Sequence, residues 1–176
     1  MSMGLIDKDG WTEQNQILTP SFEVDTNADG LADNWALDNV PVCAMETIIV
    51  LNGCKSQKVT TDAAYEGIFQ SGMVAPAGTT KATAYAWICR PAAGSDIRVV
   101  LYDNTAAVAR DTQLFSTAGW QTQVVGANTW YRVVVSSNAI VAGNSHSLYI
   151  SVSALTATIF YADKAYLKWG QTTPPG

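Results

Sequence analysis

Oxygen-bearing side chains alternate along one short segment near the N-terminus. Asp25, Asn27 and Asp29 stand two residues apart, Gly30 follows, and Asp33 comes at the ninth position counted from Asp25. Carboxylate and amide oxygens at this spacing surround hard cations such as calcium, and a glycine permits the sharp turn that such a loop needs. The pattern therefore predicts a calcium-binding loop.

The acidic segment departs from a complete EF-hand, and it also has a simpler interpretation. The twelfth position of the loop is Ala36, where an EF-hand has glutamate, and no amphipathic helix flanks the segment. Any ion here would need a further ligand from elsewhere in the chain. Asp, Asn and Gly are also the usual turn residues, so a solvated turn without metal is the alternative.

Apolar residues along the chain alternate or form short blocks, which Gly, Pro, Asn and Ser interrupt. This pattern is typical of all-β sandwiches, and no segment has a convincing helical period. We expect two packed antiparallel sheets, a jelly-roll β-sandwich. The predicted strands are residues 17–24, 47–51, 56–60, 68–74, 81–90, 97–103, 121–125, 131–135, 147–153 and 158–169.

Composition predicts one compact domain without a polyanionic partner. The 176 residues are 48% hydrophobic and 14% charged, which is enough to build one sizeable core. With 10 basic and 15 acidic residues the net charge is −5, which argues against nucleic acid or an anionic membrane as partner. No apolar run is long enough to cross a bilayer, and the N-terminus lacks a signal-peptide pattern. We expect a soluble protein that does not carry its own export signal.

The two ends of the chain are predicted to be appendages to a domain over residues 17–170. Residues 1–16 form an N-terminal arm, and residues 171–176 form an extended tail that contains a Pro-Pro pair. Leu5, Ile6 and Trp11 are too few to build a core, but they could anchor the arm on a neighbouring chain. The alternative is that the arm folds back on its own sandwich.

Residue types that often carry catalysis give little support for it here. His146 lies in a polar turn, Gly143-Asn-Ser-His-Ser147, without a neighbouring nucleophile or metal-ligand pattern, so we interpret it as a solvated turn residue. Cys43, Cys54 and Cys89 are odd in number and lack metal-site spacing, which favours free buried thiols. A Cys43–Cys54 disulfide stays open if the protein works outside a cell. We assign no catalytic residue.

Five segments resemble a known family when they are taken in order. They are Pro20-Ser-Phe-Glu23 followed by Asp29-Gly30 and Trp35, then residues 53–60, 78–90, 129–133 and 159–167. Together they resemble carbohydrate-binding modules of the family 4/9/22 type, which belong to the galactose-binding-like jelly rolls. The resemblance implies the jelly-roll fold over about residues 17–170. It implies less about a ligand, because such jelly rolls also occur in phage tails and virion surface proteins.

The resemblance also implies a structural calcium ion. Glu23 and Asp163 match the positions that hold this ion in the family, near the edge of the sandwich. The acidic loop of Asp25, Asn27, Asp29 and Asp33 would then extend that site or form a separate one.

Strand alternation assigns side chains to faces, and the resemblance gives one face a function. The predicted inward positions are Ala84, Ala86, Ile88, Ile97, Val99, Leu101, Leu148, Ile150 and Val152. Trp87 falls where these modules commonly place a sugar-stacking aromatic, and the next strand is expected to direct its outward residues to the same face. The predicted ligand platform is Tyr85, Trp87, Arg98, Tyr102 and Tyr149. An ordinary strand surface or a protein contact explains these aromatic residues equally well.

Two functional hypotheses follow. The first is a non-catalytic structural or adhesion subunit, a decoration or tail-associated protein of a virus particle. Its partners would be capsid or tail proteins, with cell-surface glycan as a possible ligand, and it would lie on the virion surface. The alternative is a carbohydrate-binding module that accompanies a secreted carbohydrate-active enzyme, which would be extracellular and would need export.

Overall fold

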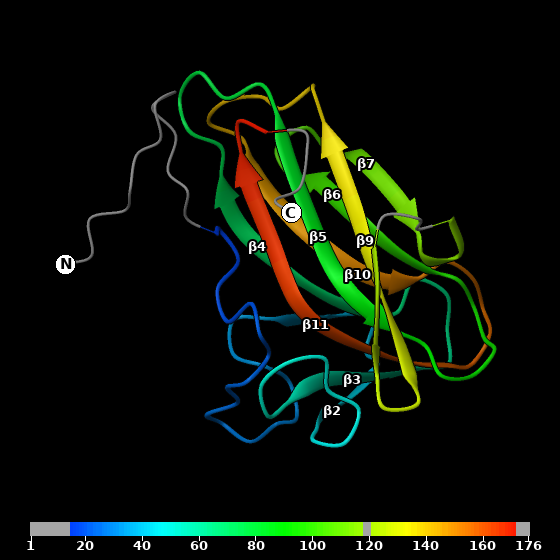
Figure 1. The fold of residues 1–176 in the computed structure, drawn as a ribbon. Helices are drawn as coiled ribbons and strands as arrows, with labels where there is room; N and C mark the ends of the chain where they lie inside the picture. Colours follow the sequence, from blue (N-terminus) through cyan, green and yellow to red (C-terminus); the bar gives the residue numbers. More distant parts are fainter. Residues whose placement is uncertain (1–14, 118–120, 172–176) are drawn as a thin grey trace.

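The computed structural model describes residues 15–117 and 121–171, which form two antiparallel β-sheets packed face to face (Figure 1). The five-stranded sheet has the order β1 (Ala36–Asp38), β4 (Gly67–Val74), β10 (Ser145–Val152), β6 (Ile97–Asp103) and β7 (Val108–Leu114). The six-stranded sheet has the order β2 (Val42–Glu46), β3 (Ser56–Thr61), β11 (Thr158–Trp169), β5 (Ala82–Cys89), β9 (Asn128–Ser137) and β8 (Gln121–Val125). The predicted all-β, two-sheet jelly roll is confirmed.

Helix is almost absent from the described part of the chain. A single 3-10 turn, η1 (Phe115–Thr117), follows β7. Within residues 15–117 and 121–171, no helix has the length and apolar character needed to cross a membrane.

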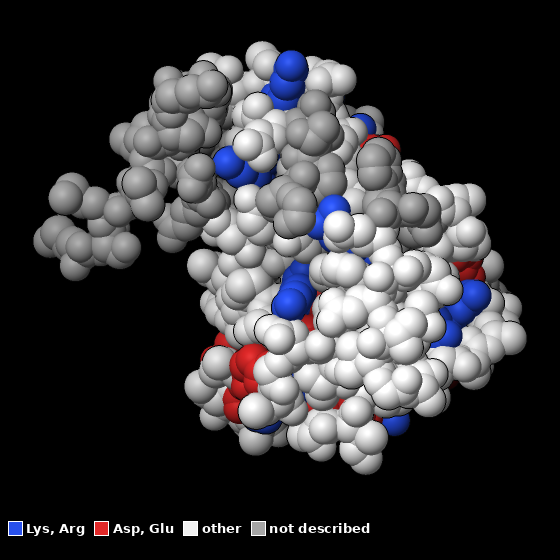
Figure 2. All heavy atoms as spheres, viewed as in Figure 1, with Lys and Arg blue, Asp and Glu red and all other residues white. Residues whose placement is uncertain are grey.

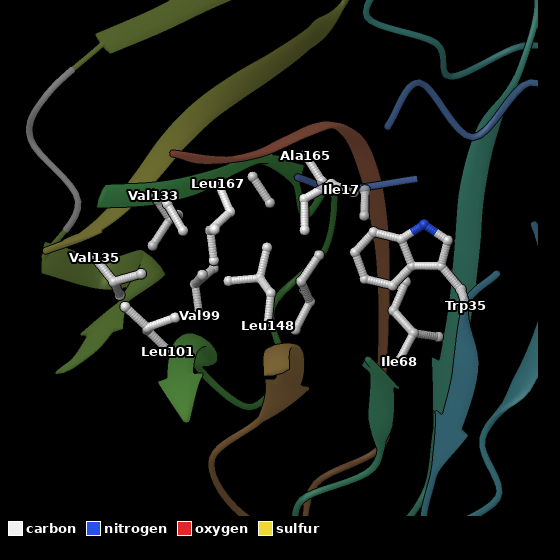
Figure 3. Close-up of a cluster of buried hydrophobic side chains, with 14 of the residues drawn as sticks. Ile17, Trp35, Ile68, Val99, Leu101, Val133, Val135, Leu148, Ala165 and Leu167 are labelled. Carbon is white, nitrogen blue, oxygen red and sulfur yellow. The ribbon is translucent and has the colours of Figure 1, made fainter. Parts of the chain in front are cut away.

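The core between the sheets forms from the side chains that strand alternation directs inward. All nine predicted core residues of β5, β6 and β10 are fully buried. In Figure 3, Val99, Leu101 and Leu148 of the five-stranded sheet meet Val133, Val135 and Leu167 of the six-stranded sheet. Because burying one such aliphatic side chain stabilises the fold by about 1.5–3 kcal/mol, this layer provides the main driving force for folding.

The segment before β1 docks on the sandwich without forming the strand predicted over residues 17–24. Thr19 and Phe22 have positive φ values of 48° and 54°, which break the extended conformation. Asn15 and Gln16 instead hydrogen bond to β11, where the Gln16 N–H donates to the Leu167 carbonyl at 3.0 Å. The sandwich therefore begins before residue 17, while Leu5, Ile6 and Trp11 lie outside the described residues.

Other strand predictions differ from the structure at the edges of the sheets. Residues 47–51 are not a strand, because the Glu46 carboxylate accepts hydrogen bonds from the Thr47 and Ile48 N–H groups and turns the chain there. Strands β1, β2 and β7 were not predicted. They are short or exposed edge strands with mixed polar and apolar residues, so alternation marks them weakly.

Candidate functional site

A pocket of about 280 Å³ lies on the outer face of the five-stranded sheet. Its floor crosses the strands from β1 to β7, and the turn between β3 and β4 forms one wall. We call this pocket the groove. Its lining residues are Asp38, Asn39, Tyr65, Arg98, Val100, Tyr102, Ala109, Thr112 and Tyr149.

The two charged residues of the groove lie in one row across the sheet. Asp38 pairs with Gly67, Gly67 pairs with Ser151, and Ser151 pairs with Arg98. A Cβ atom at Gly67 would lie 2.1 Å from the Ile150 carbonyl oxygen and 2.5 Å from the Ser151 Cα, so β4 can approach β10 this closely only with glycine. The side chains of Asp38 and Arg98 thus face each other across a gap in the sheet surface.

Arg98 is held in place by two contacts. Its Nε donates a hydrogen bond to the Ser151 Oγ at 2.9 Å. Its guanidinium carbon lies 4.5 Å from the centroid of the Tyr65 ring, within the range of a cation–π contact. Among the described residues, the terminal Nη atoms of Arg98 make no hydrogen bond, so they can donate to a ligand.

The turn that carries Tyr65 is fixed by Glu66. This buried carboxylate accepts hydrogen bonds from the Asp62 N–H at 2.6 Å and the Ala63 N–H at 2.9 Å. Tyr65 has φ of 64°, an unfavourable value for a bulky residue, and its side chain is 50% exposed. Backbone strain of this kind persists where surrounding contacts enforce it and is common at ligand sites.

Aromatic rings line the middle of the groove. Tyr149 is stacked on Phe69 with a centroid distance of 4.9 Å, and Tyr102 meets Tyr149 edge-on at 5.9 Å. These contacts fix the orientation of Tyr149 and Tyr102, which are partly exposed. Rigid rings of this kind can contact the apolar faces of pyranose sugars.

The electrostatics of the groove suit a ligand that is polar but uncharged. Burial raises the pKa of Asp38, and the positive charge of Arg98 acts in the opposite direction. The carboxylate and the guanidinium balance each other, so the site offers an acceptor and several donors without net charge. Neighbouring sugar hydroxyl groups provide both donors and acceptors, and they match this arrangement.

The structure divides the predicted ligand platform between the two outer faces of the sandwich. Arg98, Tyr102 and Tyr149 come together in the groove, but Tyr85 and Trp87 belong to β5 in the opposite sheet. The prediction of one shared face was wrong because β5 and β6 are consecutive in sequence but lie in different sheets. Outward residues of the two sheets point in opposite directions.

On that opposite face, Tyr85 and Trp87 make contacts within the six-stranded sheet. Tyr85 stacks on Tyr166 at 5.1 Å, and the Arg132 guanidinium lies 5.2 Å from the Tyr85 ring centroid. Trp87 packs against a small hydrophobic cluster formed by Leu51, Cys89, Trp130 and Tyr161. Figure 2 views the molecule from this side and shows Lys and Arg side chains scattered over the visible surface, not gathered in one patch.

Residues that sequence reasoning missed complete the groove. Asp38, Asn39 and Tyr65 come from turns and from a strand of only 3 residues, which no periodicity reveals. An aromatic residue in a polar turn, as in Asp62-Ala-Ala-Tyr-Glu-Gly67, was the available signal for Tyr65.

The carboxylates of Glu23 and Asp163 approach the same short loop after residue 50. Glu23 Oε1 accepts a hydrogen bond from the Cys54 N–H at 2.9 Å, and Asp163 Oδ2 accepts one from the N–H of Leu51 and of Asn52, each at 3.2 Å. Gly53 has φ of 82°, which favours glycine, and a Cβ atom there would lie 1.9 Å from Glu23 Oε1, so the Glu23 carboxylate would have to move.

Asp163 has the properties of a carboxylate that lacks a counter-charge. It is fully buried, and burial raises its pKa to about 6 against the effect of three backbone hydrogen bonds. The negative charge of Glu23 raises the pKa further. A cation between the two carboxylates would compensate both charges, so this oxygen-rich pair fits calcium.

In the acidic loop, the predicted metal ligands form hydrogen bonds within the loop itself. Asp25 accepts from the Gly30 N–H at 3.0 Å, Asp29 accepts from the Leu31 N–H at 2.9 Å and from the Asn27 amide, and Asp33 accepts from the Thr26 N–H at 2.9 Å. Figure 2 shows acidic side chains at the lower left, where Figure 1 places this part of the chain. Within residues 15–117 and 121–171, no three His, Cys, Asp or Glu side chains are arranged to hold a metal ion.

The prediction of His146 as a solvated turn residue was wrong, because this side chain is fully buried. Its Nδ1 lies 3.1 Å from the Asn144 carbonyl, and its Nε2 lies 3.6 Å from Asp103 Oδ2. Burial of Asp103 acts to raise its pKa, but hydrogen bonds from Asn144, Ala106 and Arg110 outweigh this effect and lower the pKa to about 2. These contacts join the end of β6 and the start of β7 to the start of β10.

The three cysteines are free thiols. Cys89 is buried as predicted, but Cys43 is only partly buried and Cys54 is exposed. The disulfide between Cys43 and Cys54 that the sequence left open is not formed.

Comparison with known proteins supports the fold. No family model matches the sequence, and no curated protein matches it. Among solved structures, the chain is similar to the C-terminal family 22 carbohydrate binding module of Clostridium thermocellum Xyn10B. The TM-score is 0.60 at 16% identity, and the match covers 97% of this chain and 100% of that chain.

Two further matches extend the comparison. TmCBM61, solved in complex with β-1,4-galactotriose, has a TM-score of 0.56 at 13% identity, and the match covers 88% of this chain and 98% of that chain. The enzymatically active domain of Bacteriophage CBA120 tailspike protein 4 has a TM-score of 0.56 at 10% identity, with 88% of this chain and 21% of that chain covered. At these identities the matches establish the fold. The resemblance to carbohydrate-binding modules is confirmed at that level.

Proposed function

We propose that this chain is a non-catalytic glycan-binding module, and that its ligand is a neutral oligosaccharide bound in the groove of the five-stranded sheet. The observation that carries the proposal is the arrangement of Tyr65, Arg98 and Asp38. An exposed ring stands beside a fixed guanidinium, and a carboxylate faces that guanidinium in the same row of the sheet.

The groove has room for one ring of an oligosaccharide, and it is open to solvent along the sheet. Its volume of about 280 Å³ accommodates about one sugar ring at a time, and its floor continues across the sheet to Thr112 of β7. Tyr149 and Tyr102 supply apolar contact, while Asp38 and Arg98 orient the hydroxyl groups.

Binding of a panel of neutral oligosaccharides tests this proposal. Xylohexaose and β-1,4-galactotriose belong in the panel because similar folds were solved with these ligands. We expect one member of the panel to bind, and Tyr65→Ala to weaken its binding by about tenfold or more. If the protein binds none of the neutral glycans in the panel, the proposed glycan binding is contradicted and a purely structural role is favoured.

A matched control separates the two faces. Tyr85→Ala removes a tyrosine side chain as well, but from the opposite sheet, where the Tyr85 ring stacks on Tyr166 outside the groove. We expect this variant to retain binding. Loss of binding with Tyr85→Ala or Trp87→Ala, but not with Tyr65→Ala, would instead place the ligand on the six-stranded sheet.

The biological setting we propose is an accessory subunit of a virus particle, a decoration or tail-associated protein that lies on the virion surface. Its partners would be capsid or tail proteins, and Leu5, Ile6 and Trp11 would provide the contacts. The fold similarity to a phage tailspike domain supports this setting. Deleting residues 1–14 should leave a folded domain that no longer joins its assembly, and normal assembly would contradict this role.

The second setting, a module that accompanies a secreted carbohydrate-active enzyme, is supported by the similarity to modules of xylanases. Co-purification separates the two settings. Particle proteins recovered with the full chain would favour the virion, and a glycoside hydrolase recovered with it would favour the enzyme-associated role.

We also propose that calcium stabilises the fold through Glu23 and Asp163. Support comes from the two neighbouring carboxylates and from the raised pKa of the buried Asp163. The loop of Asp25, Asn27, Asp29 and Asp33 is a second candidate, because its oxygens suit the same ion.

A further inference from the structure

A second pocket lies at the end of the sandwich where β5 ends and β9 begins. Its volume is about 300 Å³, and its lining includes Cys89, Arg90, Phe115, Asn128, Thr129 and Tyr131. We call it the end pocket. Among residues 15–117 and 121–171 it shares no lining residue with the groove, so a ligand there would be recognised independently.

Arg90 is fixed at the wall of the end pocket by its own loop. Its Nη1 donates hydrogen bonds to the carbonyl oxygens of Gly94 at 3.1 Å and Ser95 at 2.7 Å. Its guanidinium carbon lies 5.1 Å from the centroid of the Phe115 ring. Among the described residues all hydrogen bonds of Arg90 leave from Nη1, so Nε and Nη2 remain for a ligand.

The rest of the wall combines aromatic rings with neutral polar groups. Phe115 and Tyr131 meet edge-on at 4.8 Å, which fixes both rings. Asn128 and Thr129 follow the tight turn between β8 and β9 and are partly exposed. Within the described residues their side chains make no hydrogen bond, so an amide and a hydroxyl are available beside Arg90.

The charge of the end pocket distinguishes it from the groove. In the groove Asp38 faces Arg98, whereas none of the described residues that line the end pocket is acidic. Burial raises the pKa of the Cys89 thiol to about 11, so this side chain is also uncharged at neutral pH. Although the chain carries a net charge of −5, this pocket has one positive charge without a partner in its lining.

We propose that the end pocket binds the carboxylate of an acidic sugar, a hexuronate. A fixed guanidinium whose Nε and Nη2 groups are available as donors can bind a carboxylate through charge-assisted hydrogen bonds, which are stronger than neutral hydrogen bonds. The Asn128 amide and the hydroxyls of Thr129 and Tyr131 match the sugar hydroxyl groups, and the rings of Phe115 and Tyr131 contact its apolar face.

Methyl glucuronoside and its neutral methyl ester form the matched pair of probes. Both are titrated into the isotope-labelled full chain while backbone amide chemical shifts are recorded. We expect the acid to shift the amides of Asn128, Thr129 and Tyr131, and to bind about tenfold or more tightly than the ester. Its affinity should fall with added salt, because a charged contact is screened.

Variants locate the site and separate it from the groove. Arg90→Gln should abolish binding of the acid, and Thr129→Val should weaken it while leaving the contacts of Arg90 to its loop intact. Tyr65→Ala should have no effect on the acid, so failure of the groove and failure of the end pocket are distinguishable.

Three results would overturn the proposal: equal affinity for acid and ester, shifts confined to groove residues, or no shift at all. An acidic peptide that shifts the same amides at lower concentration than the glucuronoside would overturn the assignment to a sugar.

Discussion

The guanidinium carbon of Arg98 lies 4.5 Å from the centroid of the Tyr65 ring. This contact joins the floor of the five-stranded sheet to the turn between β3 and β4. Each partner also has its own support, since Glu66 fixes the turn that carries Tyr65 and Ser151 accepts a hydrogen bond from Arg98. The pair creates the wall of the groove on which the proposed function depends.

Gly67→Ala should destabilise the protein. The added Cβ would lie 2.1 Å from the Ile150 carbonyl oxygen, so β4 and β10 would have to separate. We expect a loss of about 2–3 kcal/mol in the free energy of unfolding, measured by urea denaturation. Gly72→Ala is the control, because nothing lies within 4 Å of its Cβ position and only the cost of its positive φ, about 1 kcal/mol, applies. Equal effects of the two variants would contradict the close approach of the strands.

His146 should make the protein less stable as the pH falls. Burial lowers the pKa of His146 in the folded state, and the charge of Arg110 adds to this, while Asp103 and the Asn144 carbonyl act in the opposite direction. In the unfolded chain His146 therefore takes up a proton near pH 6.5, whereas in the folded chain it stays neutral at this pH. The free energy of unfolding therefore falls as the pH decreases below this value.

His146→Gln isolates this effect. The pKa of Asp163 is raised to about 6, so its contribution has the opposite sign, and it cancels when wild type and variant are compared at the same pH. Between pH 7 and pH 5 the free energy of unfolding of the wild type should fall relative to that of His146→Gln, measured by urea denaturation. A difference independent of pH would show that His146 keeps its ordinary pKa in the folded state.

Removal of calcium should lower the melting temperature. An ion that binds only the folded state stabilises it by mass action, by about 2.7 kcal/mol at one hundred times its dissociation constant. We expect a chelator to lower the melting temperature of the wild type and to have no effect on Asp163→Asn. Asp29→Asn tests the acidic loop in the same way. A wild-type melting curve that is the same with calcium and with chelator would contradict both sites.

The sequence predicts the inner face of the fold better than its outer faces. Alternation of apolar and polar residues identifies inward positions such as Ala86, Val99 and Leu148, because burial applies to each strand separately. The same pattern cannot tell which strands share a sheet. Alternation therefore predicted Trp87 and Arg98 on one surface. In the structure the chain crosses from one sheet to the other after β5, so the two residues lie on opposite faces.

The candidate site was only partly predictable for a related reason. Tyr102 and Tyr149 lie on regular strands, where alternation directs them outward. Tyr65 and Asn39 lie in turns with positive φ values, and their positions depend on contacts such as the two hydrogen bonds that Glu66 accepts. His146 was misassigned because its turn sequence is polar, whereas its burial results from packing against Trp169 at 5.2 Å and from the approach of Asp103.

The most direct test of the proposed function is the affinity of the wild type, Tyr65→Ala and Tyr85→Ala for the neutral oligosaccharide that the panel identifies, measured by titration calorimetry. The account predicts that Tyr65→Ala weakens binding by about tenfold or more while Tyr85→Ala binds like the wild type. Unchanged affinity of a correctly folded Tyr65→Ala variant would contradict the groove as the binding site.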